Sequence, residues 1–127
     1  MELIRGIHNL RDRHRGCVAT IGNYDGVHLG HQYMIAAVRA KATELGVPAA
    51  VVTFEPTPRE FFEGPAAPSR LTRLREKLEA LALYGVDRVV VLRFNRRMQG
   101  MAADEFVDRL GYTSGPVAVH RNDMVLI

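Results

Sequence analysis

Two histidines three residues apart stand where a glycine-rich turn meets a predicted helix. The stretch reads Gly22-Asn23-Tyr24-Asp25-Gly26-Val27-His28-Leu29-Gly30-His31. Glycines let a backbone turn tightly and approach a ligand, and a helix N-terminus offers N–H groups that suit phosphate. Histidines at i and i+3 share one helix face, from which they can donate hydrogen bonds to phosphate oxygens. The stretch therefore predicts a nucleotide-phosphate site.

The spacing narrows the kind of site. No Gly-Lys-Ser/Thr closes the turn, so it is not a P-loop. Gly22, Gly26 and Gly30 are four residues apart, which does not match the dinucleotide-binding fingerprint. What remains is His-x-Gly-His at a helix start. Phosphoryl-type transfer depends mainly on positioning and charge stabilisation, so a site of this kind needs no nucleophile from the protein.

Simpler interpretations of the same residues stay open. His28 and His31 can form a structural helix start or half of a metal site, although zinc needs three or four ligands and no other residue has a suitable spacing. Asn23 and Asp25 can be turn residues that bond to their own backbone. We interpret Asp25 in that way and Asn23 as a nucleotide contact.

Alternating apolar strands and helices must position this turn. A strand over 17–21 enters it, and a helix over 29–45 leaves it, with an apolar stripe of Leu29, Met34, Ile35, Val38, Ala42 and Leu45 and with Gly46 as its end. We expect an edge strand near 3–7, strands over 48–54 and 86–94, a short turn over 59–63, a helix over 72–84 capped by Thr72, and a weaker helix over 102–110. Such alternation predicts an α/β, Rossmann-like, doubly wound parallel sheet, which binds ligands beyond the C-terminal ends of its strands.

Composition limits the class of protein. The 127 residues suffice for one domain, and 47% hydrophobic content is ordinary for a globular chain. A net charge of +3, spread over scattered arginines, does not indicate nucleic acid as a partner. The single cysteine, Cys17, and the lack of a run of 18 apolar residues predict a cytoplasmic protein without a membrane partner. His8 and His14 have no ligand spacing, and we expect both at the surface.

Several segments carry a resemblance to one family. The motif from Thr20 to Gln32 resembles the signature of the His-x-Gly-His nucleotidyltransferases, most closely the adenylyltransferase domain of bacterial FAD synthetase, the bifunctional riboflavin kinase/FMN adenylyltransferase. Tyr24 stands where that family usually has Phe. The resemblance covers about residues 1–110. Further matching segments are Leu3–Leu10, Thr53–Pro56, Arg70–Lys77, Gly85–Asp87 and Arg93–Asn95.

The resemblance implies a nucleotidyltransferase fold and adenylyl transfer from ATP to FMN, giving FAD and pyrophosphate, with Mg²⁺ bridging the phosphates. It assigns His28 and His31 to stabilising charge on the phosphates. The ATP pocket that it implies is formed by Gly22, Asn23, Tyr24, Gly26 and Gly30. The flavin contacts that it implies are Glu55, Pro56, Pro58 and Phe62.

The sequence departs from the family pattern after Gly111. The Ile-Ser-Ser-Thr-x-x-Arg motif that opens a helix on the triphosphate is missing, and Val117–Val119 is left as the expected fourth strand. We expect one nucleotidyltransferase domain over 1–127, incomplete at its C-terminus, with an unpaired sheet edge that favours association and without a riboflavin kinase domain. Two alternatives stay open: a non-catalytic nucleotide- or flavin-binding remnant, and another His-x-Gly-His enzyme of the cytidylyltransferase or pantetheine-phosphate adenylyltransferase type. The sequence does not predict an oligomeric state.

Overall fold

The computed structural model of the chain describes residues 1–11, 14, 16–55, 58–66, 73–96, 118–119 and 124–126. Its strands are β1 (Glu2–Arg5), β2 (Val18–Ile21), β3 (Ala49–Phe54), β4 (Arg88–Leu92), β5 (Ala118–Val119) and β6 (Met124–Leu126). Its helices are α1 (Leu29–Leu45), α2 (Pro58–Glu63) and α3 (Leu74–Leu83). Three 3₁₀ turns are η1 (Ile7–Asn9), η3 (Asp25–Val27) and η4 (Gly64–Ala66).

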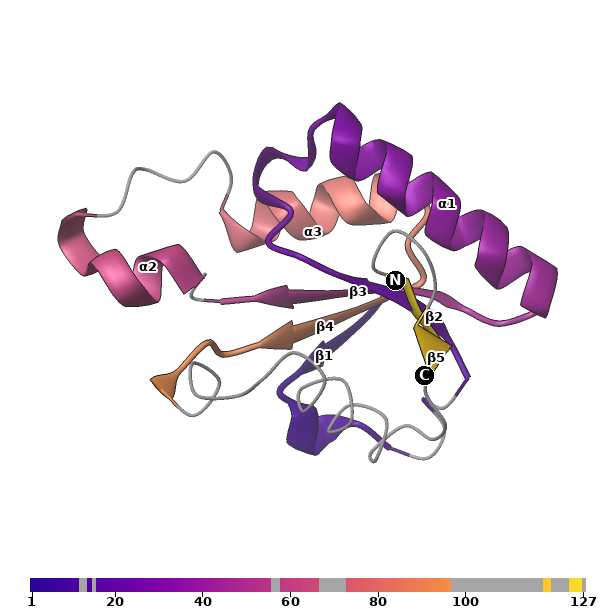
Figure 1. Cartoon of the computed structure of the whole chain (residues 1–127), viewed down its shortest axis with the longest axis horizontal. Helices are drawn as coiled ribbons and strands as arrows, with labels where there is room; N and C mark the ends of the chain where they lie inside the picture. The colour runs from indigo at the N-terminus through magenta and orange to yellow at the C-terminus, as the bar shows by residue number, and fades with distance from the viewer. Residues whose placement is uncertain are drawn as a thin grey trace.

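The strands form one sheet in the order β1-β4-β3-β2-β6-β5, in which the first four run parallel. The residues of β4, and all but the last residue of β3, are buried, as expected for parallel strands that are covered on both faces. The helices α1 and α3 lie together on one side of the sheet (Figure 1). The predicted α/β, Rossmann-like fold is confirmed, while the helix predicted over 102–110 lies outside the described residues.

The C-terminal strands correct the expected sheet edge. Strand β6 pairs antiparallel with β2, in the register Val18↔Leu126, and β5 pairs antiparallel with β6. The edge of β2 is therefore occupied, and the strand expected at 117–119 lies one place further out. Strand β6 was not predicted because a run of three residues is too short to show a strand periodicity.

Helix α1 has the predicted bounds, and Gly46 ends it in the left-handed region with φ of 68°. Of the predicted stripe, Ile35, Val38 and Ala42 are buried, but Leu29 is 79% exposed and Leu45 is 43% exposed. A helix of 17 residues is about 25 Å long. The strands beneath it have four to six residues and reach about 13–20 Å. The ends of the helical stripe therefore project past the sheet into solvent.

Helix α3 begins two residues later than predicted. Its first residue is Leu74, and the cap position is held by Arg73, whose side chain makes no capping hydrogen bond. Thr72, predicted as the cap, lies outside the described residues. The apolar side of the helix is confirmed by the buried Leu81. Between these leucines, Lys77 is also fully buried, which the sequence did not indicate.

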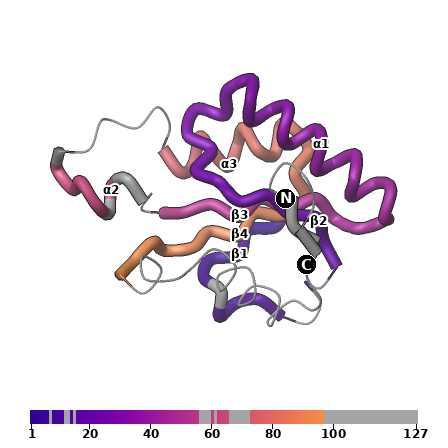
Figure 2. The backbone as a smooth tube through the Cα atoms, in the orientation of Figure 1, coloured from indigo at the N-terminus to yellow at the C-terminus, as the bar shows by residue number. Residues whose placement is uncertain are grey.

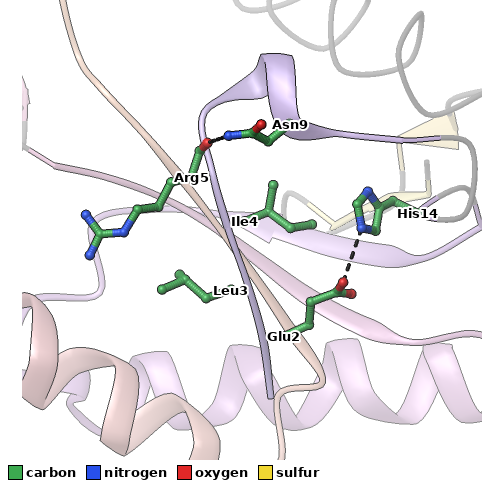
Figure 3. Close-up of a pocket in the computed structure, with 6 residues that line it drawn as sticks. All are labelled: Glu2, Leu3, Ile4, Arg5, Asn9 and His14. Carbon is green, nitrogen blue, oxygen red and sulfur yellow. Dashed lines mark hydrogen bonds and ion pairs between the residues drawn. The ribbon is translucent and has the colours of Figure 1, made fainter.

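His14 is not at the surface as predicted; it is 2% exposed, whereas His8 is exposed. Its Nδ1 accepts a hydrogen bond of 2.8 Å from the backbone N–H of Arg11, and its Nε2 lies 3.2 Å from Oε2 of Glu2 (Figure 3). Arg88 donates from Nε to the other Glu2 oxygen at 3.0 Å and from Nη1 to the backbone carbonyl of His14 at 2.9 Å. The loop after β1 therefore folds back and is fastened to β1 and β4.

The same residues border a cavity of about 370 Å³. Its lining comes from β1 and the loop that follows, and the side chain of Arg5 points away from the His14–Glu2 pair (Figure 3). The cavity is lined by Glu2, Leu3, Ile4, Arg5, Asn9 and His14. Among the described residues, no helix is long and apolar enough to cross a membrane.

Candidate functional site

The predicted turn lies at the C-terminal edge of the parallel strands. After β2 ends, the N–H of Gly22 donates to the carbonyl of Val52 in β3 at 3.0 Å. After β3 ends, the N–H of Glu55 donates to the carbonyl of Leu92 in β4 at 2.9 Å. The segments that follow all three strands therefore start from one edge, which is where open α/β sheets bind their ligands. Figure 2 follows the chain from β2 through the turn into α1, and from β3 out to α2.

The backbone of the turn is strained. Tyr24, Gly26 and Val27 have φ angles of 53°, 76° and 38°. Positive φ is easy for glycine, but it is a genuine outlier for a β-branched residue such as Val27. Strain of this kind persists only where the surrounding structure enforces it, and it gathers at ligand-binding segments. The conformation therefore favours a binding turn over a simple connection.

His28 forms the cap of α1. Its Nδ1 accepts hydrogen bonds from the backbone N–H groups of Gly30 at 3.1 Å and His31 at 3.4 Å. An Nδ1 that accepts must carry the lone pair, so this network assigns the proton of the neutral ring to Nε2. His28 therefore forms the start of the helix, which is one of the simpler interpretations given above. The side chain is exposed, and its Nε2–H is directed by the same cap that holds the ring.

His31 lies between two rings. Its imidazole stacks on that of His28 with centroids 3.7 Å apart and an interplanar angle of 17°, and the ring of Tyr24 lies 4.7 Å away. Nδ1 of His31 is buried, and in the described part of the chain it has no hydrogen-bond partner. Burial lowers the pKa of His31, the charges of His28 and Lys77 lower it further, and Asp25 opposes them. His31 is therefore predominantly neutral at pH 7.

Two glycines make room for these rings. A Cβ on Gly30 would lie 3.0 Å from Cε1 of His28, and a Cβ on Gly22 would lie 3.0 Å from Cε2 of Tyr24. Both distances are shorter than ordinary van der Waals contact. Gly26 is exposed and is needed for its positive φ. The glycines thus shape the site by admitting the aromatic rings.

Asn23 and Tyr24 differ in their exposure to solvent. The side chain of Asn23 is exposed, and its backbone carbonyl accepts a hydrogen bond of 3.1 Å from the hydroxyl of Thr53. Tyr24 is only 2% exposed, and its hydroxyl donates to Oγ1 of Thr20 at 2.9 Å. Tyr24 therefore has almost no free surface for a nucleotide, and it contributes to the site by supporting His31 from beneath.

Aromatic side chains gather beside the turn at the same edge of the sheet. The ring of Phe94, which follows β4, lies 5.9 Å from Phe54 at the end of β3 and 5.6 Å from Phe62 on α2. We call Phe54, Phe62 and Phe94 the aromatic cluster. Phe62 is 58% exposed, and α2 lies beyond the C-terminal end of β3 (Figure 1). The cluster is an apolar feature at the same edge of the sheet as the polar turn.

The predicted flavin contacts meet this cluster only in part. Phe62 belongs to it, Glu55 follows β3 and is half-buried, and Pro58 is the first residue of α2. Pro56 lies outside the described residues. Phe54 and Phe94 were missed, although the signal was present: each stands at or just after the end of a predicted strand, and neighbouring parallel strands end at one edge.

Comparison with known proteins decides the family. The family model of FAD synthetase matches residues 10–119 of the chain. The chain belongs to the FAD synthetase family. The match includes the whole strained turn, both histidines and the aromatic cluster, so the site described above is one that the family model covers.

Curated relatives of the chain are named bifunctional riboflavin kinase/FMN adenylyltransferases. The protein of Pseudomonas fluorescens is 58% identical over 110 residues, which are 87% of this chain and 35% of the relative. The proteins of Haemophilus influenzae and Escherichia coli K12 are 50% and 49% identical, over 86% and 87% of this chain and 35% and 36% of theirs. The chain spans about a third of the length of these relatives.

A solved structure shares the fold. A Streptococcus pneumoniae chain described as a macrolide-efflux protein aligns with a TM-score of 0.73 and 24% identity, over 84% of this chain and 36% of that one. At this identity the similarity concerns the fold alone. It supports the α/β arrangement on which the candidate site is built.

The site offers the ring of His28, whose Nε2–H is free to donate because its Nδ1 accepts from the backbone N–H groups of Gly30 and His31. In the described ranges no three His, Cys, Asp or Glu side chains gather to hold a metal ion.

Proposed function

We propose that this chain transfers the adenylyl group of ATP to FMN. A phosphate oxygen of FMN attacks the α-phosphorus of ATP, the bond to the bridging oxygen of the β-phosphate breaks, and FAD and pyrophosphate leave. The observation that carries the proposal is the stacked pair of His28 and His31 at the start of α1, in a chain of the FAD synthetase family. The relatives that are named FMN adenylyltransferases support the same reaction.

The chain's own groups have distinct tasks in this reaction. His28 donates from Nε2–H to a phosphate oxygen, in a direction fixed by its cap on Gly30 and His31. His31 is neutral before substrate binds and adds a second donor as negative charge develops on the leaving pyrophosphate. Gly22, Asn23 and Gly26 shape the turn around the nucleotide. Mg²⁺, when bound with ATP, neutralises phosphate charge.

The aromatic cluster provides the proposed flavin contact. An isoalloxazine ring is large and flat with an apolar dimethylbenzene side, and it gains from stacking against aromatic faces. Phe62 is exposed and Phe94 is partly exposed at the edge of the sheet that carries the turn. We also propose Glu55, Pro56 and Pro58 as flavin contacts, because they follow Phe54 of the cluster closely in the sequence. A wall of three phenylalanines favours FMN over the smaller acceptors of other His-x-Gly-His enzymes.

We further propose that residues 1–127 act as a single nucleotidyltransferase domain in the cytoplasm. One sheet joins strands from both ends of the chain, which supports a single unit. The lone thiol of Cys17 is buried and raised in pKa, chiefly by burial, which suits a reducing compartment.

The direct test is FAD formation from FMN, ATP and Mg²⁺ by the purified chain, resolved by chromatography. We expect FAD from the wild type and from His8→Ala, in which an exposed histidine outside the site is removed. We expect none from the double variant His28→Ala/His31→Ala. Binding of FMN and ATP by a folded wild-type chain that forms no FAD would contradict the proposal and indicate the non-catalytic remnant. Competition against FMN by cytidylyl or pantetheine-phosphate acceptors would indicate the other enzyme types.

A further inference from the structure

Lys77 is an unusual residue for the middle of a helix that packs on a sheet. It is one of only two lysines in the chain, and its side chain is 0% exposed. Lysine is among the residues least often buried, because an ammonium group taken out of water must be compensated by polar partners. One such partner is the hydroxyl of Thr53, whose Oγ1 accepts from Lys77 Nζ at 3.4 Å. The burial of Lys77 therefore needs an explanation, which the other contact of Thr53 supplies.

Thr53 connects Lys77 to the glycine-rich turn over residues 22–31. The hydroxyl of Thr53 has one hydrogen, which it donates to the backbone carbonyl of Asn23 at 3.1 Å, while it accepts from Lys77. Thr53 is itself fully buried. A single polar chain thus runs from α3 through the end of β3 to the second residue of the turn. It joins a buried positive charge to the backbone that carries His28 and His31.

We propose that Lys77 is a positioning residue of the adenylyl-transfer site, holding the turn through Thr53 and placing a buried positive charge beneath the phosphate positions. This inference rests on the proposed function for its substrate and adds a residue to it. A positive charge in a low-dielectric interior acts over several ångströms, and it does not need to reorganise when negative charge develops above it. Lys77 is connected to the turn through Thr53, so we assign it a role in positioning and in the local electric field.

The charges around His31 provide a readout of this role. The groups that face His31 are His28, stacked on one side, Tyr24 on the other, and Asp25 and Lys77 nearby. The charge of Lys77 lowers the pKa of His31, and that of Asp25 raises it. Removing the lysine charge removes one of the effects that lower the pKa of His31, whereas the effect of Asp25, which raises it, remains. The pKa of His31 should then move upward. A loss of packing that exposed His31 would move it in the same direction, so the matched variant must loosen the turn and keep the lysine charge.

The experiment compares Lys77→Met with Lys41→Met, which removes the other lysine, on α1, where it pairs with Glu44. Imidazole titrations followed by NMR should show a higher midpoint for His31 in Lys77→Met and no change in Lys41→Met. Binding of a non-hydrolysable ATP analogue should weaken about tenfold in Lys77→Met. Thr53→Val breaks the polar chain but keeps the charge, so it should weaken analogue binding and leave the titration of His31 in place.

An unchanged His31 titration and unchanged analogue affinity in a folded Lys77→Met variant would overturn the inference. Should that variant not fold, ¹⁵N-lysine labelling of the wild type gives the answer, because only two Nζ signals exist and Lys41→Met assigns them. An ammonium signal of Lys77 that moves when the analogue binds supports the inference, and a neutral amine at pH 7 overturns it. None of these measurements requires turnover. A chain that forms no FAD while His31 shifts in Lys77→Met loses the proposed function and keeps the role of Lys77.

Discussion

The imidazole rings of His28 and His31 lie nearly parallel with their centroids 3.7 Å apart, and the first ring holds the helix that carries the second. Nδ1 of His28 binds the backbone N–H of His31, so the two side chains are fixed to each other through both ring contact and main chain. A change at His28 therefore affects helix stability and phosphate contact together, and the two effects need separate variants.

The cap and the phosphate contact of His28 can be separated by substitution. His28→Ala removes both and should lower the free energy of unfolding by about 1 kcal/mol. His28→Asn restores a capping oxygen, so it should recover most of that stability while FAD formation remains about 10²–10³-fold below wild type. Urea denaturation and a chromatographic FAD assay measure the two properties. Equal activity of His28→Asn and wild type would show that capping is the only task of His28.

The stability of the fold should depend on pH through His31. Its pKa in the folded chain is lowered from the ordinary 6.5, mainly by burial. The unfolded chain then binds the proton more readily. The stabilising contribution is complete above about pH 6.5 and is lost as the pH falls through that value toward the folded pKa. His31→Gln should flatten this dependence between pH 7.5 and 5 in urea titrations, and His8→Gln should not. A matching slope in His31→Gln and wild type would contradict the assignment.

The aromatic cluster should control the use of flavin but not of ATP. Phe94→Ala removes the ring that contacts both Phe54 and Phe62, and we expect KM for FMN to rise about tenfold, as for the loss of one aromatic contact. KM for ATP should stay within about twofold. Phe94→Leu keeps apolar volume without a ring and serves as the control for packing. A similar rise in the KM values for FMN and ATP would show that Phe94 supports the structure of this sheet edge and does not contact flavin specifically.

The fastening of the first loop should affect stability without affecting the site. His14→Ala removes the acceptor of the Arg11 N–H and the contact with Oε2 of Glu2, whose other oxygen keeps its bond to Arg88, and each hydrogen bond lost costs about 1 kcal/mol. We expect a lower midpoint of thermal unfolding and unchanged kcat for FAD formation at a temperature where the variant is folded. His8→Ala, at an exposed position six residues earlier, should change neither.

Sequence periodicity predicted the elements around the turn well, because local rules govern them. The bounds of α1 agree with the prediction, since the capping histidine begins the helix and Gly46 ends it by local backbone geometry. The pairing of His28 and His31 on one face followed from the helical spacing. Their stacking, and the tautomer of His28, depend on side-chain orientation that spacing does not specify.

The residues that were missed depend on contacts between distant parts of the chain. Lys77 has the sequence character of a solvated helix position, and its bond to Thr53, 24 residues earlier, is one of the contacts that compensate its burial. His14 is buried because Arg88 and Glu2 surround it, 74 and 12 residues away in the sequence. Charge and polarity patterns predict exposure on average, so buried polar networks are where they fail.

The pairing of Glu2 with Arg88 has a consequence for the order of assembly during synthesis. A ribosome adds about 5–20 residues per second, so roughly 4 to 18 seconds pass between the first strand and its partner. Strand β2, helix α1 and strand β3 need only the first 54 residues for their mutual contacts. Strands β2 and β3, with the helix that carries the two histidines, can therefore form on the nascent chain, whereas β1 is made before them and must wait for β4.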